Sequence, residues 1–173
     1  SMRIAHRILS ILDKASPARI AEAHCDIPCG IYDPYHAQLA AHTVIRMVNL
    51  INELKISSMD APIEERKVFI HQLSRYTAVK EEHAEVVKKE VRILWGDYFK
   101  PEHVQQYPEL HELVWKIMKL GSKARQEVNM DAAKELLEAV QKIAVIFWKS
   151  KGMDTTRIKA PSPLGGEIVA QKG

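Results

Sequence analysis

The sequence predicts an all-α protein built as an antiparallel four-helix bundle. Three observations lead to this fold class. Ala, Leu, Glu and Lys, which favour helix, dominate the 173 residues. Apolar residues recur at a spacing of three and four in four separate stretches. The connections between these stretches are short, which favours antiparallel neighbours in a bundle.

The first two helices are expected over residues 36–56 and 61–95. Asp60 is a suitable N-cap for the second of these, and Pro62 falls in its first turn, where proline is tolerated. Gly96 is expected to end this helix, since glycine commonly follows a helix C-terminus.

The last two helices are expected over residues 108–120 and 131–150. Pro101 and Pro108 mark a short turn before the third helix, and Asp131 is a suitable cap for the fourth. The four predicted helices therefore span residues 36–150.

The two ends of the chain differ from this pattern. Residues 1–23 include Ser1, which we expect to be left from expression, and a short basic amphipathic segment. This segment is either an N-terminal helix of the mature protein or a part that a protease removes. Residues 152–173 are rich in Gly, Pro and Thr, and we expect a mobile tail or a clasp on a neighbouring subunit.

Composition excludes several classes of function. The chain is 46% hydrophobic and 27% charged with a net charge of +3, as in ordinary globular proteins. It has no basic stripe interleaved with aromatic residues, so we expect no nucleic-acid partner. No apolar run approaches the ~18 residues that a membrane span requires, so we expect no membrane partner and a cytoplasmic protein.

Both cysteines of the chain lie within residues 24–32, "HCDIPCGIY", which we call the hook segment. The three-residue gap between Cys25 and Cys29 differs from the C-x-x-C of thioredoxin-like proteins. A structural zinc site would need two more nearby Cys or His ligands. The spacing alone leaves a metal site, a local disulfide and a redox pair open.

The residues between the cysteines favour a tight turn. Pro28 biases Ile27 toward an extended conformation, and a cis bond between them would bring both sulfurs to one side. If His24 began the mature chain, its amine and the Cys25 amide would join the two thiolates. Two sulfur and two nitrogen donors in a plane suit Ni(II) or Cu(II).

The hook segment resembles the nickel hook H-C-x-x-P-C-G-x-Y of the nickel superoxide dismutases. Three further stretches resemble that family: "LWGDYFKP" at 94–101, "YPELHELV" at 107–114 and "IFW" at 146–148. The resemblance covers residues 24–150.

The resemblance implies a homo-hexamer of four-helix bundles, each with an N-terminal metal-binding hook. It implies a prosegment, residues 1–23, cut by a processing protease between Ala23 and His24. The mature domain is then 24–151, followed by the tail 152–173. Nickel would be held by the His24 amine, the Cys25 amide and the thiolates of Cys25 and Cys29, with the His24 imidazole as an axial ligand. The reaction would be 2 O2•− + 2 H+ → O2 + H2O2.

Further residues are expected around that site. Tyr32 and Tyr98 would stand over the open face of the nickel, and Lys100 would attract the superoxide anion. Asp26 and Pro28 lie within the hook beside the ligands.

Two positions depart from the family pattern. Ala40 stands where the family has a glutamate and His83 where it has an arginine, and these two residues hold the hook histidine in the family. Either His83 or His42 is a candidate to support His24 instead, and the alternative is that both are hydrogen-bonded core histidines.

Two other functions remain as alternatives. One is a thiol–disulfide redox protein that uses Cys25 and Cys29. The other is a helical assembly module in which the two cysteines form only a structural clip.

Overall fold

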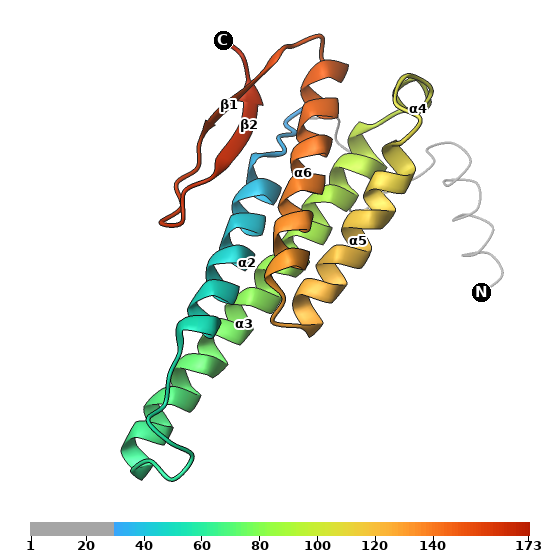
Figure 1. Cartoon of the computed structure of the whole chain (residues 1–173). Coiled ribbons are helices and arrows are strands. Elements are labelled where there is room, and N and C mark those ends of the chain that lie inside the picture. Colours follow the sequence, from blue (N-terminus) through green and yellow to red (C-terminus); the bar gives the residue numbers. More distant parts are fainter. Residues whose placement is uncertain (1–29) are drawn as a thin grey trace, which may run out of the picture. The chain divides into compact units, whose positions relative to one another are not determined.

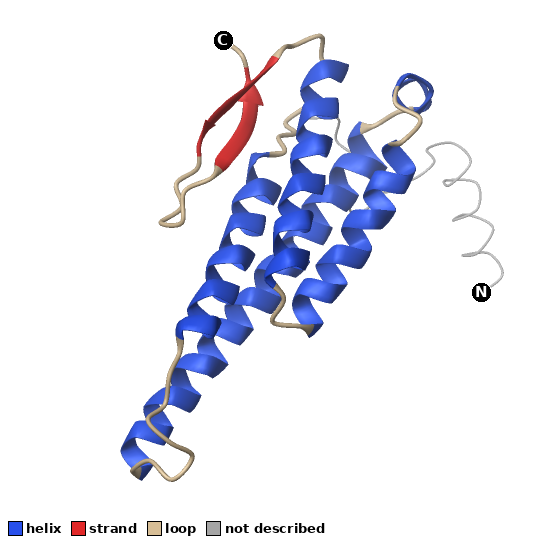
Figure 2. Cartoon of the chain, viewed as in Figure 1, coloured by secondary structure: helices blue, strands red, loops and turns tan. Residues whose placement is uncertain are grey.

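The computed structural model describes residues 30–173, which are mainly helical (Figures 1 and 2). The helices are α2 (Tyr35–Glu53), α3 (Ile63–Ile93), α4 (Pro101–Gln106), α5 (Leu110–Gln126) and α6 (Met130–Ser150). A π-helical turn, η1 (Leu94–Tyr98), continues α3, and two strands, β1 (Thr155–Lys159) and β2 (Glu167–Gln171), follow α6. The helical architecture predicted from the sequence is confirmed for these residues.

The helices α2, α3, α5 and α6 pack against one another around a shared apolar core (Figure 1). Each helix contributes residues from one apolar face, as the helical spacing of the sequence requires. The fully buried members include Val44, Val87, Ile117, Leu136 and Phe147.

Two glycines bear on where the second and third helices end. Gly96 does not end the second helix, because η1 carries the chain to Tyr98 and closes with a bond from Phe99 N to Leu94 O of 2.9 Å. The third helix runs six residues beyond residue 120 and includes Gly121. Gly121 is buried, and a Cβ atom there would lie 2.8 Å from Lys88 Cγ. Glycine at this position allows α3 and α5 to approach closely.

The N-caps also differ from the predicted ones. Asn129, not Asp131, caps α6, and its side chain accepts a 2.9 Å bond from Ala132 N. For α3, the N-cap position is Pro62, not Asp60.

The expectations of an all-α fold and a mobile tail are both wrong for residues 152–173. Strands β1 and β2 form an antiparallel hairpin in which Thr155 pairs with Gln171 and Lys159 with Glu167. Ile168 and Val169 are buried, and β2 contacts both α2 and α6. We call residues 155–171 the C-terminal hairpin.

Polar side chains of the helices hold this hairpin through its backbone. The Gln38 amide accepts from Val169 N at 2.8 Å and donates to Val169 O at 3.0 Å. Both His42 Nε2, at 3.0 Å, and Gln141 Nε2, at 2.7 Å, donate to Glu167 O. These bonds satisfy polar groups that the packing of the hairpin buries.

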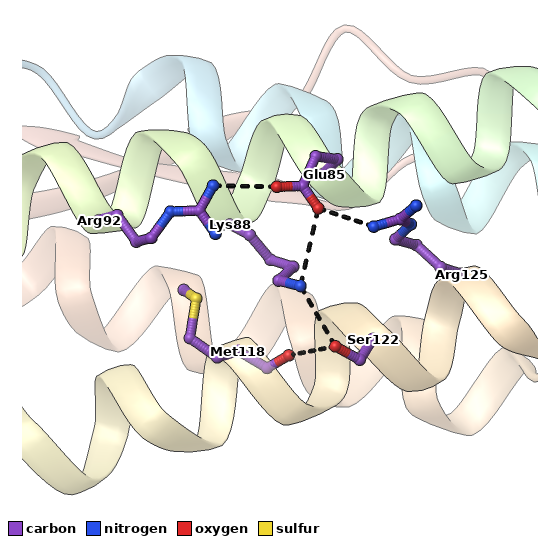
Figure 3. A network of polar contacts seen from close by, with 6 residues as sticks. All are labelled: Glu85, Lys88, Arg92, Met118, Ser122 and Arg125. Carbon is purple, nitrogen blue, oxygen red and sulfur yellow. Dashed lines mark hydrogen bonds and ion pairs between the residues drawn. The ribbon is translucent and has the colours of Figure 1, made fainter.

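A charged network joins α3 to α5 (Figure 3). Glu85 receives bonds of 2.9 Å from both Arg92 and Arg125 and lies 3.6 Å from Lys88 Nζ. The hydrogen bond from Arg92, with the neighbouring positive charges, lowers the pKa of Glu85 against a smaller opposing effect of burial. The carboxylate therefore stays ionised and links the two helices.

A buried lysine caps the end of α5. Lys80 is only 1% exposed, and its Nζ donates to the carbonyl oxygens of Ala124, Arg125 and Glu127 at 2.6, 2.7 and 3.0 Å. Burial lowers the pKa of Lys80, while the negative end of the α5 dipole favours a cation here. Lys80 therefore supplies three donors to carbonyls that the helix itself leaves without partners.

Candidate functional site

The predicted metal ligands lie outside the described residues. This applies to the ligands His24, Cys25 and Cys29 and to the neighbouring Asp26 and Pro28. It also applies to the peptide bond between Ile27 and Pro28 and to Ala23 at the predicted cleavage point. Within residues 30–173, no group of three or more His, Cys, Asp or Glu side chains is placed to hold a metal ion.

The structure brings together the two tyrosines of the predicted site. Tyr32 precedes α2 and Tyr98 ends η1, so 65 residues lie between them. Their ring centroids are 5.6 Å apart with the planes tilted by 54°. Both side chains are half-buried. The last residue of the hook segment therefore packs against the family-like stretch at residues 94–101.

The π-helical turn sets the position of Tyr98. The five-residue closure from Leu94 O to Phe99 N adds one residue to the helical turn and redirects the side chains that follow. The Tyr98 ring then packs on Phe147 at 4.6 Å and stacks on His103 at 5.7 Å with an interplanar angle of 12°.

The sequence did not predict a polar partner for Tyr98. Its Oη lies 2.7 Å from Ser150 Oγ at the end of α6. Lys151, the next residue, holds its Nζ 5.6 Å from the centre of the Tyr98 ring and 4.8 Å from that of Phe147. The only signal was that both residues closely follow the "IFW" stretch at 146–148.

Lys100 has an exposed side chain on the short segment after η1. It lines a pocket of about 510 Å³ together with Trp95, Phe99, Val104 and His111. Trp95 Nε1 donates to His111 Nδ1 at 2.8 Å across this pocket. Lys100 is thus accessible to solvent, while Lys151 is the lysine whose ammonium contacts the Tyr98 ring.

The two candidate supports for His24 have different partners. His42 is 6% exposed and its Nε2 is bonded to Glu167 O in the C-terminal hairpin. His83 is half-buried on α3, and its Nδ1 lies 2.9 Å from Val79 O. Because a carbonyl accepts, Nδ1 carries the hydrogen, and a neutral His83 ring presents Nε2 as an acceptor. Ala40 is buried in the core on α2.

No helix within residues 30–173 is long and apolar enough to cross a membrane.

Comparison with known proteins identifies the family. A family model described as nickel-containing superoxide dismutase matches residues 19–151. Superoxide dismutase [Ni] of Streptomyces coelicolor is 38% identical over 136 residues, which are 79% of this chain and 94% of that protein. The same enzyme of Streptomyces seoulensis is 36% identical over 136 residues, with the same shares of both chains.

Solved structures agree with this result. The native structure of a nickel superoxide dismutase superposes with a TM-score of 0.63 at 35% identity, covering 74% of this chain and 99% of that one. A structure with nickel ligation corresponding to the oxidised state gives a TM-score of 0.64 at 34% identity, with 75% and 99% covered. The chain therefore belongs to the nickel-containing superoxide dismutases, whose cofactor is nickel and whose substrate is superoxide.

Proposed function

We propose that this enzyme disproportionates superoxide at a nickel ion held by the hook segment, after cleavage between Ala23 and His24. The observation that carries the proposal is the contact between Tyr32 and Tyr98, with ring centroids 5.6 Å apart. Tyr32 is the last residue of the hook segment, and Tyr98 belongs to the family-like stretch at residues 94–101. Their contact supports a site at this end of a four-helix bundle.

The donor set of the hook segment fits nickel. Cys25 and Cys29 supply two thiolates, and a free N-terminal His24 supplies an amine and an imidazole beside the Cys25 amide. When bound to these electron-rich donors, nickel would supply a +2/+3 redox couple, the chemistry that the disproportionation of superoxide requires.

The described side chains control access to that site. The rings of Tyr32 and Tyr98 narrow the approach and order water, which protects the thiolates from oxidation by the peroxide product. The exposed ammonium of Lys100 attracts the superoxide anion and raises its rate of encounter. Two superoxide ions and two protons give one dioxygen and one hydrogen peroxide.

His83 is the residue that we propose to support the His24 imidazole. Its Nδ1 is held by Val79 O, which fixes the ring and leaves Nε2 to accept a hydrogen bond. His42 is less suited to this role because its Nε2 already serves the C-terminal hairpin.

The remaining proposals concern processing and assembly. Residues 1–23 are the prosegment, residues 24–151 form the hook and bundle domain, and residues 152–173 follow it. The family match ends at residue 151, the proposed end of that domain. We further propose a homo-hexamer in the cytoplasm and a dedicated processing protease.

The test compares two forms of the chain, one uncleaved and one that begins at His24. The cleaved form should bind one nickel per chain and consume superoxide. The uncleaved form should bind nickel poorly, because Ala23 converts the His24 amine into an amide. Nickel content, the optical spectrum and superoxide decay are the measurements. Stoichiometric square-planar nickel in the uncleaved form would refute the maturation step.

Two controls separate the alternatives. A dithiol–disulfide enzyme would act without metal and without a free His24, so activity of the nickel-free protein would support it. A structural clip would leave activity intact in Cys25→Ser, whereas a nickel ligand would not.

A further inference from the structure

The last turn of α6 contains a short chain of hydrogen bonds that ends at Tyr98. Tyr98 Oη lies 2.7 Å from Ser150 Oγ, and Ser150 Oγ donates to Phe147 O at 2.7 Å. The side chains of Tyr98 and Ser150 are both half-buried. These two bonds share one hydroxyl group, so their directions are linked.

The end of the helix determines which way the serine hydrogen points. The amide of Lys151 donates to Trp148 O at 3.1 Å instead of to Phe147 O. The amides of Gly152 and Met153 donate to Lys149 O and Trp148 O at 2.9 and 3.0 Å, and Gly152 has φ +73°. This is a Schellman ending, and it leaves Phe147 O for the Ser150 hydroxyl to serve.

The number of hydroxyl hydrogens determines which residue donates in the hydrogen bond between Tyr98 and Ser150. A serine hydroxyl has one hydrogen and can accept further bonds. Because that hydrogen goes to Phe147 O, Tyr98 must donate its own hydrogen to Ser150. The Tyr98 ring is also held by Phe147, His103 and Tyr32. Tyr98 Oη therefore has only lone pairs left to offer to other molecules.

A Tyr98 hydroxyl that can only accept hydrogen bonds interacts differently with superoxide than with water or hydrogen peroxide. Superoxide has no hydrogen, so it cannot donate a bond to those lone pairs. Water and hydrogen peroxide carry O–H groups and can donate to them. A Tyr98 that only accepts thus holds water or peroxide and keeps the tyrosine hydrogen away from the superoxide anion.

We propose that Ser150 is a positioning residue that fixes Tyr98 as a hydrogen-bond acceptor in the active site. The proposal rests on the proposed function, because that function places Tyr98 beside the substrate. In this proposal Ser150 acts through its hydrogen bond to Tyr98.

The test uses Ser150→Ala, which removes the acceptor, and Ser150→Thr, which retains the hydroxyl. Ser122→Ala is the matched control, because Ser122 also bonds a carbonyl of its own helix, Met118 O at 3.0 Å, but not a tyrosine. Tyr98→Phe identifies the signal of this tyrosine. All variants are made in the chain that begins at His24.

The first measurement is the tyrosine doublet in the Raman spectrum of the nickel-free protein, which reports whether a phenol donates or accepts. Ser150→Ala should shift the Tyr98 component away from the donor state, and Ser150→Thr and Ser122→Ala should not. The second is kcat and KM for superoxide with nickel bound. Ser150→Ala should lose about fivefold in kcat/KM, the equivalent of one hydrogen bond, and threonine should restore it.

Three results would overturn the proposal, and each has a different meaning. An unchanged Raman doublet in Ser150→Ala would show that Tyr98 does not donate to Ser150. A changed doublet with full turnover, while Tyr98→Phe loses turnover, would remove the role of Ser150 and leave the proposed function intact. Full turnover in Tyr98→Phe would remove Tyr98 from the site and the present proposal with it.

Discussion

At the scale of single residues, position 83 is where we predict that this chain departs from the pattern of its family. The resemblance places His83 where the family has an arginine and Ala40 where it has a glutamate, so the two charges expected to hold the hook histidine would both be absent. Ala40 is buried in the core, where it offers no polar atom. His83 is half-buried and oriented by Val79 O at 2.9 Å. One histidine ring would then take the place of two charged side chains.

His83→Ala should lower superoxide turnover by about 10- to 100-fold while nickel remains bound, because a partner that orients a ligand affects activity to this extent. Nickel content and superoxide decay check this in the chain that begins at His24. His71→Ala is the control, since His71 is exposed on the same helix and should have no effect. Unchanged turnover in His83→Ala would show that another group supports His24.

At the scale of elements, one buried cation contributes to the junction between α3 and α5. Lys80 serves three carbonyl oxygens at the end of α5 from the neighbouring helix. Lys80 is only 1% exposed, although lysine side chains usually lie in solvent. The carbonyls at the end of another helix, which no local pattern shows, account for this difference.

Lys80→Met should reduce the free energy of unfolding by about 2–4 kcal/mol, because it keeps the aliphatic stem but leaves buried carbonyls without donors. Lys89→Met is the control on the exposed side of the same helix, where we expect a change within about 0.5 kcal/mol. Denaturant unfolding of both variants checks this. Equal effects would mean that water serves the α5 carbonyls as well as Lys80 does.

At the scale of the whole described molecule, the C-terminal hairpin is the part that the family match does not include. The match ends at residue 151, and the hairpin covers residues 155–171. Its docking requires Gly166, which has φ +97° and would place a Cβ atom 2.7 Å from His42 Cε1. Gly165 has φ +71°, but a Cβ atom there would meet no atom within 4 Å.

These two glycines give a matched pair of substitutions. Gly165→Ala should lower the free energy of unfolding by about 1 kcal/mol, because alanine is strained at a positive φ. Gly166→Ala adds the clash with His42, so it should lower the free energy of unfolding by about 2–3 kcal/mol. Hydrogen exchange at the amides of β2 should also become faster. Thermal unfolding and hydrogen exchange check this. Equal costs for both variants would show that the hairpin does not depend on its contact with His42.

The sequence by itself determined the helical architecture, and its resemblance to a known family selected nickel among the metals that the donors suit. The helical spacing of apolar residues is local and could be read directly. The hook segment is also local, because its donors lie within six residues and the chemistry of two thiolates beside a histidine narrows the choice of ion.

Only the tertiary structure decided the contacts between distant segments. The hairpin packs on the helices through hydrogen bonds from Gln38, His42 and Gln141 to its backbone. No pattern within residues 152–173 indicates those partners. The partnership of Tyr98 with Ser150 likewise joins η1 to the end of α6. Such bonds depend on where helices come to lie, which is set by packing of the whole core and not by any one stretch of sequence.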